Sequence, residues 1–231
     1  MNTTENVAVQ KTTKPSFNIE EVLTAPELAR FYEESNRTEF GKRDTIFKQG
    51  SRVTEVALVI SGLVKVTREM RKGKNLILRV AQPGCFVGIS SGLASETYEY
   101  SVCSMETTTI RTISVDTLRW LMESNHRFAN EINQRICSEN LFNISRLSSL
   151  LSKQLPGRVA DIILYFSQDI FSSNEFSIPL TRQELAELAG TTKESLIRTL
   201  SEFKNDKIID MNRNVFSINS FNILKTLSRL G

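Results

Sequence analysis

A single uninterrupted helical segment divides this chain into two parts of different character. Residues 127–153 contain neither proline nor glycine, and their apolar residues recur at helical spacing. Short runs rich in β-branched residues precede this segment, whereas helical patterns follow it beyond Pro156 and Gly157. A chain of 231 residues suits two modest domains, and we predict the boundary at this proline–glycine pair.

The part before the long helix predicts a compact antiparallel β-barrel or jelly roll. Its runs are short, and turn residues such as Gly50 and Pro83-Gly84 bound them. The predicted strands are residues 45–47, 55–60, 63–67, 76–80 and 107–113, with another around Val102. Residues 88–97 are rich in Gly and Ser, so we interpret them as a loop. Residues 1–18 are polar, and we expect a disordered tail there.

Composition excludes several classes of protein. The chain is 40% hydrophobic and 24% charged, which is typical of a folded protein. No stretch approaches the roughly 20 apolar residues of a membrane span, and the N-terminus lacks the apolar region of a secretory signal. We therefore expect a cytoplasmic protein. The single histidine, His126, and three scattered cysteines argue against a metal site, a disulfide framework and a Ser-His-Asp enzyme.

Residues 180–200 read LTRQELAELAGTTKESLIRTL and predict two helices joined by a short turn. Thr181 followed by Glu184 has the pattern of a capping box. Gly190 tolerates the left-handed conformation that ends a helix, and either Thr191 or Thr192 then caps the second helix. This arrangement favours a helix-turn-helix that binds DNA, and an ordinary corner between two helices is the alternative.

The second predicted helix turns Leu196, Leu200 and Phe203 inward, which leaves the residues near its N-terminus for DNA. In a major groove, an arginine donates two hydrogen bonds to guanine, and a glutamate accepts one from cytosine. Residues close to helix N-termini are suited to contact phosphates. The candidate DNA contacts in this segment are Thr181, Arg182, Thr192, Lys193, Glu194, Ser195 and Arg198.

Two alternatives remain for the charged residues of this helix. Arg198 can pair with Glu194 one turn away on a solvated face. Glu194 is the capping carboxylate if Thr191 is the N-cap, and it stands free only if Thr192 is the N-cap. Farther along, residues 207–210 and 215–218 flank a polar tip and predict a β-hairpin wing. Arg213 at that tip is a further candidate phosphate contact, and a solvated turn is the alternative.

A β-roll, one long helix, a hinge and a winged helix-turn-helix, in this order, resemble the Crp/Fnr family of bacterial transcription regulators. The matching stretches are VALVISGLVKV at 56–66, the Pro83-Gly84 turn and TRQELAELAGTTKESLIR at 181–198. KQLPGRVADIILYF at 153–166 is similar to members from Bacteroidetes. The resemblance implies an α+β protein with a β-roll at 19–126, a dimerisation helix and hinge at 127–155 and a DNA-binding domain at 156–231.

The family also implies how the DNA is bound. A homodimer held by paired long helices would place its second helices in successive major grooves of a palindromic site. By position in the motif, Glu194 and Arg198 match the family's base-reading residues, and Lys193 matches a nearby basic contact. The expected partners are double-stranded DNA, a second copy of the chain and RNA polymerase.

Apolar residues of the long helix fall on more than one helical phase, as expected for a helix that packs on its own domain and on a partner. A plain amphipathic surface helix is the alternative. The candidate dimer-interface residues are Ile132, Ile136, Asn140, Asn143, Leu147 and Leu150.

The sensor half departs from the cyclic-nucleotide binders of the family, which follow the loop glycine with Glu and carry Arg-Ser for the cyclic phosphate. Here Cys85 and Phe86 follow the glycine, and Tyr98 and Glu99 stand at the Arg-Ser position. We expect no arginine nearby to hold a phosphate. A carboxylate repels a phosphate, so we expect that cAMP is not the ligand. These four residues are the candidate effector pocket for an unknown effector.

No cofactor or metal is expected. Residues 1–40 contain no cysteine for an iron–sulfur cluster, and His126 lies outside the roll. The same histidine argues against an enzyme of the cupin kind, which needs a cluster of metal ligands. A regulatory module that senses a small molecule or redox state through the roll, without binding DNA, is the remaining alternative, and residues 181–218 argue against it.

Overall fold

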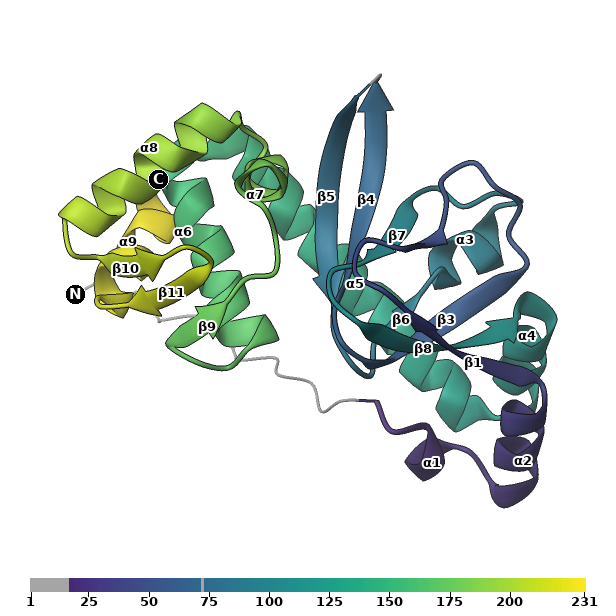
Figure 1. Ribbon diagram of the computed structural model, residues 1–231. Helices are drawn as coiled ribbons and strands as arrows, with labels where there is room; N and C mark the ends of the chain where they lie inside the picture. The colour runs from purple at the N-terminus through teal and green to yellow at the C-terminus, as the bar shows by residue number, and fades with distance from the viewer. Residues whose placement is uncertain (1–16, 72) are drawn as a thin grey trace, which may run out of the picture.

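The computed structural model describes residues 17–71 and 73–231 (Figure 1). Two short helices come first, α1 (Ile19–Val22) and α2 (Ala25–Glu33). Most of the predicted tail, residues 1–16, lies outside the described residues, but its end is not disordered. Phe17 is buried against the rings of Phe86 and Phe128, at centroid distances of 5.3 and 6.2 Å, and Asn18 caps α1. The burial of one aromatic ring corrects the prediction for these two residues.

Within the described residues, eight strands form the β-roll. Their bounds are β1 (Ser35–Phe40), β2 (Thr45–Phe47), β3 (Glu55–Ser61), β4 (Val64–Arg71), β5 (Lys74–Ala81), β6 (Phe86–Val87), β7 (Ser101–Ser104) and β8 (Thr108–Ser114). They make two antiparallel sheets, in the orders β1-β8-β3-β6 and β2-β7-β4-β5. The predicted antiparallel β-roll is confirmed. The sequence did not indicate β1, because this edge strand is polar and mostly exposed.

The segment at 88–97 is not a loop, because α3 (Ile89–Ala94) lies within it. Gly88 precedes this helix with a φ of 88°. At Gly92, an added Cβ would lie 3.0 Å from a methyl of Val56 and 3.2 Å from one of Val115. The small residues that predicted a loop instead allow the helix to pack closely on the roll.

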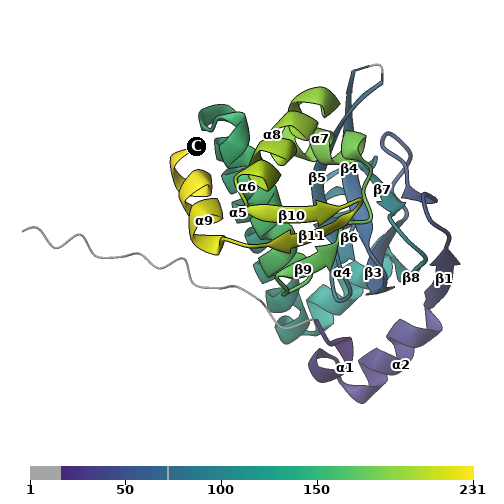
Figure 2. The same ribbon diagram turned by 60° about the vertical axis from the view of Figure 1, so that its left-hand side comes forward.

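Two helices follow the roll, α4 (Val115–Ser124) and α5 (His126–Ser152). The side chain of Asn125 caps α5 by accepting a 2.9 Å hydrogen bond from the amide of Phe128. Phe128 and Ile132 are buried in the core of the roll, so the first half of α5 belongs to the packing of that domain. The second half runs on toward the C-terminal helices (Figures 1 and 2).

The C-terminal part combines helices with a small sheet. Its elements are α6 (Leu155–Tyr165), the π-helical turn η1 (Phe166–Ile170), β9 (Glu175–Ser177), α7 (Arg182–Ala189), α8 (Lys193–Asn205), β10 (Ile209–Asn212), β11 (Val215–Ile218) and α9 (Phe221–Leu230). Pro156 lies in the first turn of α6, where its missing amide hydrogen costs nothing. The sheet has the order β10-β11-β9.

The roll and the C-terminal part pack against each other. Leu63, Ile77 and Val80 of the roll belong to the same buried cluster as the C-terminal helices. Tyr165 of α6 donates a 3.0 Å hydrogen bond to the carbonyl of Val80 in β5. Both Figures 1 and 2 show α7 beside β5. The sensor roll is therefore in direct contact with the helices that follow it.

Candidate nucleic-acid interface

The helix caps and the glycine turn that the sequence predicts are present between α7 and α8. The amide of Thr181 donates to Oε2 of Glu184 at 2.7 Å, and the amide of Glu184 donates back to the Thr181 hydroxyl at 3.2 Å. Gly190 has a φ of 61° and ends α7. A Cβ at this position would lie 2.5 Å from Cδ2 of Leu150, so glycine is required both by conformation and by space. The capping box and the glycine turn are confirmed.

The N-terminus of α8 resolves the two alternatives left by the sequence. Thr192 is the N-cap, and its hydroxyl accepts a 3.3 Å hydrogen bond from the amide of Ser195. Glu194 is therefore not the capping carboxylate. Glu194 and Arg198 are both exposed, and no ion pair joins them in the described part of the chain.

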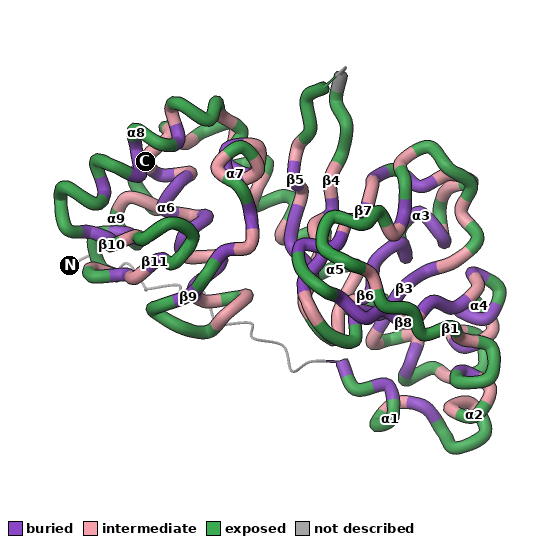
Figure 3. Tube along the Cα trace, in the orientation of Figure 1, coloured by how far each residue is buried: buried purple, intermediate pink, exposed green. Residues whose placement is uncertain are grey.

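The two faces of α8 differ sharply in exposure. Leu196, Leu200 and Phe203 are buried, as predicted. The opposite side is exposed, and Figure 3 shows exposed positions recurring along this helix. Its exposed residues near the N-terminus are Thr192, Lys193, Glu194, Ile197 and Arg198. Ser195 is half-buried, and its hydroxyl lies 3.1 Å from that of Thr192, so it supports the cap.

Arg182 lies against the wing instead of extending toward solvent. Its Nη2 donates to the carbonyl of Arg213, and its guanidinium carbon lies 5.3 Å from the ring centroid of Phe216. Burial lowers the pKa of Arg182. We predicted a phosphate contact for this residue; the structure corrects the prediction to a side chain that supports the wing, because the nearby carbonyl and ring already hold it.

The wing itself is the predicted hairpin. β10 and β11 pair with Asn212 opposite Val215, which leaves Arg213 and Asn214 as the turn. Arg213 is exposed and has a φ of 53°, a left-handed conformation that an arginine adopts at some cost. The hydrogen bond from Arg182 to its carbonyl stabilises this turn.

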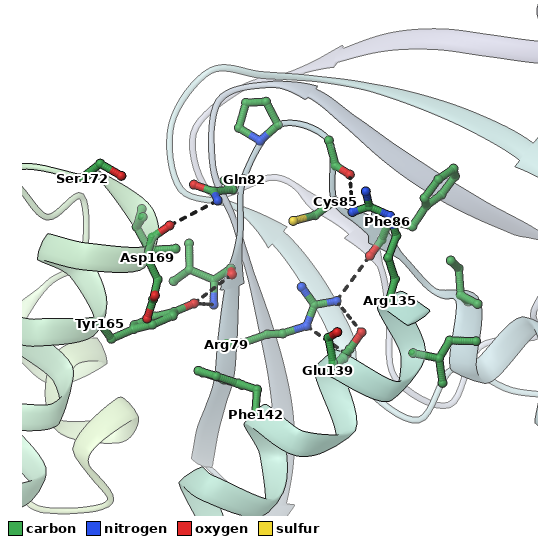
Figure 4. Close-up of a pocket in the computed structure, with 17 residues that line it drawn as sticks. Arg79, Gln82, Cys85, Phe86, Arg135, Glu139, Phe142, Tyr165, Asp169 and Ser172 are labelled. Atoms are coloured by element: carbon green, nitrogen blue, oxygen red, sulfur yellow. Dashed lines mark hydrogen bonds and ion pairs between the residues drawn. The ribbon is translucent and has the colours of Figure 1, made fainter. Parts of the chain in front are cut away.

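The four residues predicted for the effector pocket do not line one cavity. Cys85 and Phe86 line a cavity of about 460 Å³ between the end of β5, α5 and η1 (Figure 4). Tyr98 instead fills the interior of the roll: it stacks on Phe47 with a centroid distance of 4.4 Å. Glu99 is exposed, with its carboxylate 3.4 Å from Nη2 of Arg68. An arginine thus lies near Glu99, contrary to our expectation, because β4 brings it there.

The sequence did not predict the charged pair that lies at this cavity. Arg79 of β5 is 9% exposed and forms two hydrogen bonds to Glu139 of α5, at 2.9 and 3.0 Å. Burial works against the charged guanidinium, but the Glu139 carboxylate, together with smaller contributions from Cys85 and Tyr100, outweighs it and holds the pKa of Arg79 above its ordinary value. The sequence signal for this pair was the lone arginine in the apolar strand LILRV, because a charge in a buried strand needs a partner of opposite charge.

The structure divides the predicted dimer-interface residues into two groups, and it corrects the prediction for those that pack within their own chain. Ile132 is fully buried in the roll, Ile136 packs against the same core, and Leu150 lies against Gly190 of the same chain. Asn140, Asn143 and Leu147 are exposed. The large apolar side chains that α5 exposes are Leu141, Ile144, Leu147 and Leu151, at 67, 56, 57 and 79%. We call these four residues the α5 stripe.

Comparison with known proteins identifies both halves of the chain. Residues 37–125 match the cyclic nucleotide-binding domain family, and residues 157–227 match the Crp-like helix-turn-helix domain family. The transcriptional activator protein FnrA of Stutzerimonas stutzeri is 26% identical over 174 residues, which cover 73% of this chain and 70% of that protein. The chain belongs to the Crp/Fnr family of transcription regulators.

Other relatives agree with this assignment. The cAMP-activated global transcriptional regulator CRP of Salmonella typhimurium is 22% identical over 191 residues, covering 80% of this chain and 90% of that protein. The structure of FixK2 from Bradyrhizobium japonicum superimposes with a TM-score of 0.77 at 17% identity, covering 84% of this chain and 96% of that chain. This Crp/Fnr protein is therefore a DNA-binding transcription regulator.

The described residues contain neither a membrane-spanning helix nor a cluster of metal ligands. None of the helices in residues 17–71 and 73–231 is long and apolar enough to cross a bilayer. Within the same residues, no three His, Cys, Asp or Glu side chains lie close enough together to hold a metal ion.

Proposed function

We propose that this Crp/Fnr regulator acts as a homodimer that reads a palindromic operator through the N-terminal half of α8. The observation that carries the proposal is that Glu194 and Arg198 are exposed and unpaired with each other on the face opposite the buried leucines. Arg198 is assigned to guanine and Glu194 to a cytosine amino group, since these pairings match the donors and acceptors of the major groove.

Phosphate contacts are assigned to the residues that surround this face. Lys193 stands at the first position of α8, and Thr181 and Thr192 cap the two helices whose free amides favour anions. Arg213 at the wing tip is assigned to the backbone of the flanking DNA, with Arg182 holding its turn in place. These contacts position the protein and carry no sequence information.

The α5 stripe is assigned to the dimer interface. Its four side chains are apolar and more than half exposed in the single chain. They lie three or four residues apart, as expected for a helix that packs lengthwise against a second helix. Pairing through this stripe would let two α8 helices occupy half-sites about 34 Å apart.

We further propose that cAMP is not the effector and that the protein works in the cytoplasm with RNA polymerase, without catalysing a reaction. Tyr98 occupies space inside the roll, and Glu99 is an unfavourable neighbour for a cyclic phosphate. DNA and RNA polymerase are cytoplasmic partners in bacteria. A titration in which cAMP tightens DNA binding would contradict the proposal that cAMP is not the effector.

Selection from random duplexes, followed by gel-shift titration, tests the proposal. Purified protein should enrich a palindrome whose half-sites are one helical turn apart, with binding that weakens as salt rises. Failure to enrich any palindrome at low salt would remove the proposed mode of reading.

A further inference from the structure

We propose that the cavity between the roll, α5 and η1 binds a small organic anion with an apolar body, such as an aromatic or branched carboxylic acid. The cavity of about 460 Å³ falls in the range of small-molecule sites, which is about 300–1,000 Å³. It lies outside the roll, whose own interior is filled by Phe47, Tyr98 and Tyr100.

The assignment of a negative charge to the ligand rests on two arginines. Arg79 uses Nε and Nη2 for Glu139 and the Phe86 carbonyl, and among the described residues its Nη1 has no hydrogen-bond partner. Figure 4 shows this third nitrogen pointing toward Cys85 and away from Glu139. A side chain that is nine-tenths buried thus offers a free donor to the cavity.

Arg135 supplies the second donor. Its Nη1 donates to the carbonyl of Gly84 at 3.3 Å, and Glu131 is 3.9 Å from its Nη2, a long contact for an ion pair. Its Nε is buried away from the cavity, so Nη2, which makes no hydrogen bond in the described part of the chain, is the donor left for a ligand. Among the side chains that line this end of the cavity, two arginines face one carboxylate, Glu139, and Glu131 lies outside the lining. The lining at this end is therefore more positive than negative, which an anion would complement.

The other residues that line the cavity indicate the apolar part of the ligand and its total charge. Phe86, Ile89, Ile136, Phe142 and Ile170 come from three parts of the fold and present apolar surface. Asp169 lies at the far end beside Tyr165, which opposes a second negative charge on the ligand (Figure 4). A monoanion with one charged end and an apolar body therefore fits better than a phosphate-rich molecule.

A ligand bound in this cavity would contact the DNA-binding part as well as the roll. The cavity is bounded by β5 and α5 on one side and by η1 on the other, and η1 continues directly from α6 of the DNA-binding part. A ligand here would contact both halves of the chain at once. Any effect on DNA affinity rests on the proposed function, whereas the binding itself does not.

Cys85 provides a test without DNA. It is half-buried and lines the cavity, while Cys103, also half-buried, lies in β7 and serves as the matched control. The rate of alkylation of each thiol by N-ethylmaleimide is measured by mass spectrometry in the full chain. The probes are 3-phenylpropionate and its neutral amide, which have the same shape but differ in charge.

The acid should slow alkylation of Cys85 but not of Cys103. Its half-protection concentration should be at least about tenfold below that of the amide, which corresponds to 1.4 kcal/mol. Arg135→Gln should remove this preference for the acid. Ser138→Trp, which places an indole at the cavity from an exposed position on α5, should abolish protection by both probes.

Three results would overturn the proposal: equal protection by acid and amide, parallel slowing of Cys103, or no slowing of Cys85 at about 10 mM acid. Because no DNA is present, these outcomes leave the reading of the operator untouched. Conversely, a failure to select a palindrome would not affect the thiol measurement.

Discussion

At the scale of single residues, substitutions of Arg198 and Gly190 test the DNA contact and the helix-turn-helix turn. Arg198→Ala should cost about 1–3 kcal/mol of DNA-binding free energy and relax the preference at one base pair per half-site, because a bidentate contact to guanine is lost. Gel-shift titration against operators varied at each position measures this. Arg229→Ala, an exposed arginine of α9, is the matched control and should change little. Equal weakening on every sequence would contradict base reading by Arg198.

Gly190→Ala should destabilise the fold by about 2–4 kcal/mol, since it adds a left-handed alanine and a clash with Leu150. Gly50 has a φ of 80° with no atom within 4 Å of an added Cβ, so Gly50→Ala separates the two effects. That control should cost only about 1–2 kcal/mol, the conformational part. Urea unfolding of both variants gives the comparison, and equal losses would show that the contact with Leu150 is unimportant.

At the scale of elements, α5 has one half packed on its own roll and an exposed α5 stripe in the other half. Ile144→Asp places a charge in the stripe and should raise the dimer dissociation constant by roughly a hundredfold, about 2.8 kcal/mol. Light scattering after size exclusion measures the mass. Ser145→Asp, at the neighbouring exposed position outside the stripe, should leave a dimer. A wild-type monomer, or an Ile144→Asp dimer, would contradict this interface.

At the scale of the whole molecule, Glu184 joins the roll to the helix-turn-helix. Its carboxylate caps α7 and also pairs with Lys65 of β4, and both side chains are at most 19% exposed. Burial disfavours the charged form, but hydrogen bonds from Lys65 and Thr181 outweigh it and lower the pKa of Glu184 below 4.5. This carboxylate therefore contributes stability above pH 4.5 that is lost as the pH falls through its lowered pKa.

Glu184→Gln keeps a capping acceptor but removes the charge. It should cost about 1–2 kcal/mol of unfolding free energy at pH 7, and the difference from wild type should shrink as the pH falls below 4.5. Urea unfolding across pH 3–7 measures it. Lys65→Met and the double variant complete a cycle, in which a coupling near zero at pH 7 would show that the ion pair does not connect the two halves.

Local chemistry explains why much of this protein was predictable. The capping box at Thr181, the turn at Gly190 and the hairpin around Arg213 depend on residues within a few positions of one another, so their signals are contiguous in the sequence. Strands of the roll were visible for the same reason, because each one alternates or concentrates apolar residues between turns. Where the local signal was weak, as in polar β1 and the Gly- and Ser-rich α3, the prediction missed the element or assigned a loop.

Contacts between distant residues had to come from the tertiary structure. The Arg79–Glu139 pair joins residues 60 positions apart, and Lys65–Glu184 joins residues 119 apart. Neither periodicity nor capping rules say which phase of α5 packs on its own roll, which is why Ile132 and Leu150 were assigned to a dimer interface and Leu141 and Ile144 were not. Local hydrogen bonding selects helices and turns, whereas the burial of apolar surface selects how they pack, and that choice decided the cavity, the α5 stripe and the position of Arg182.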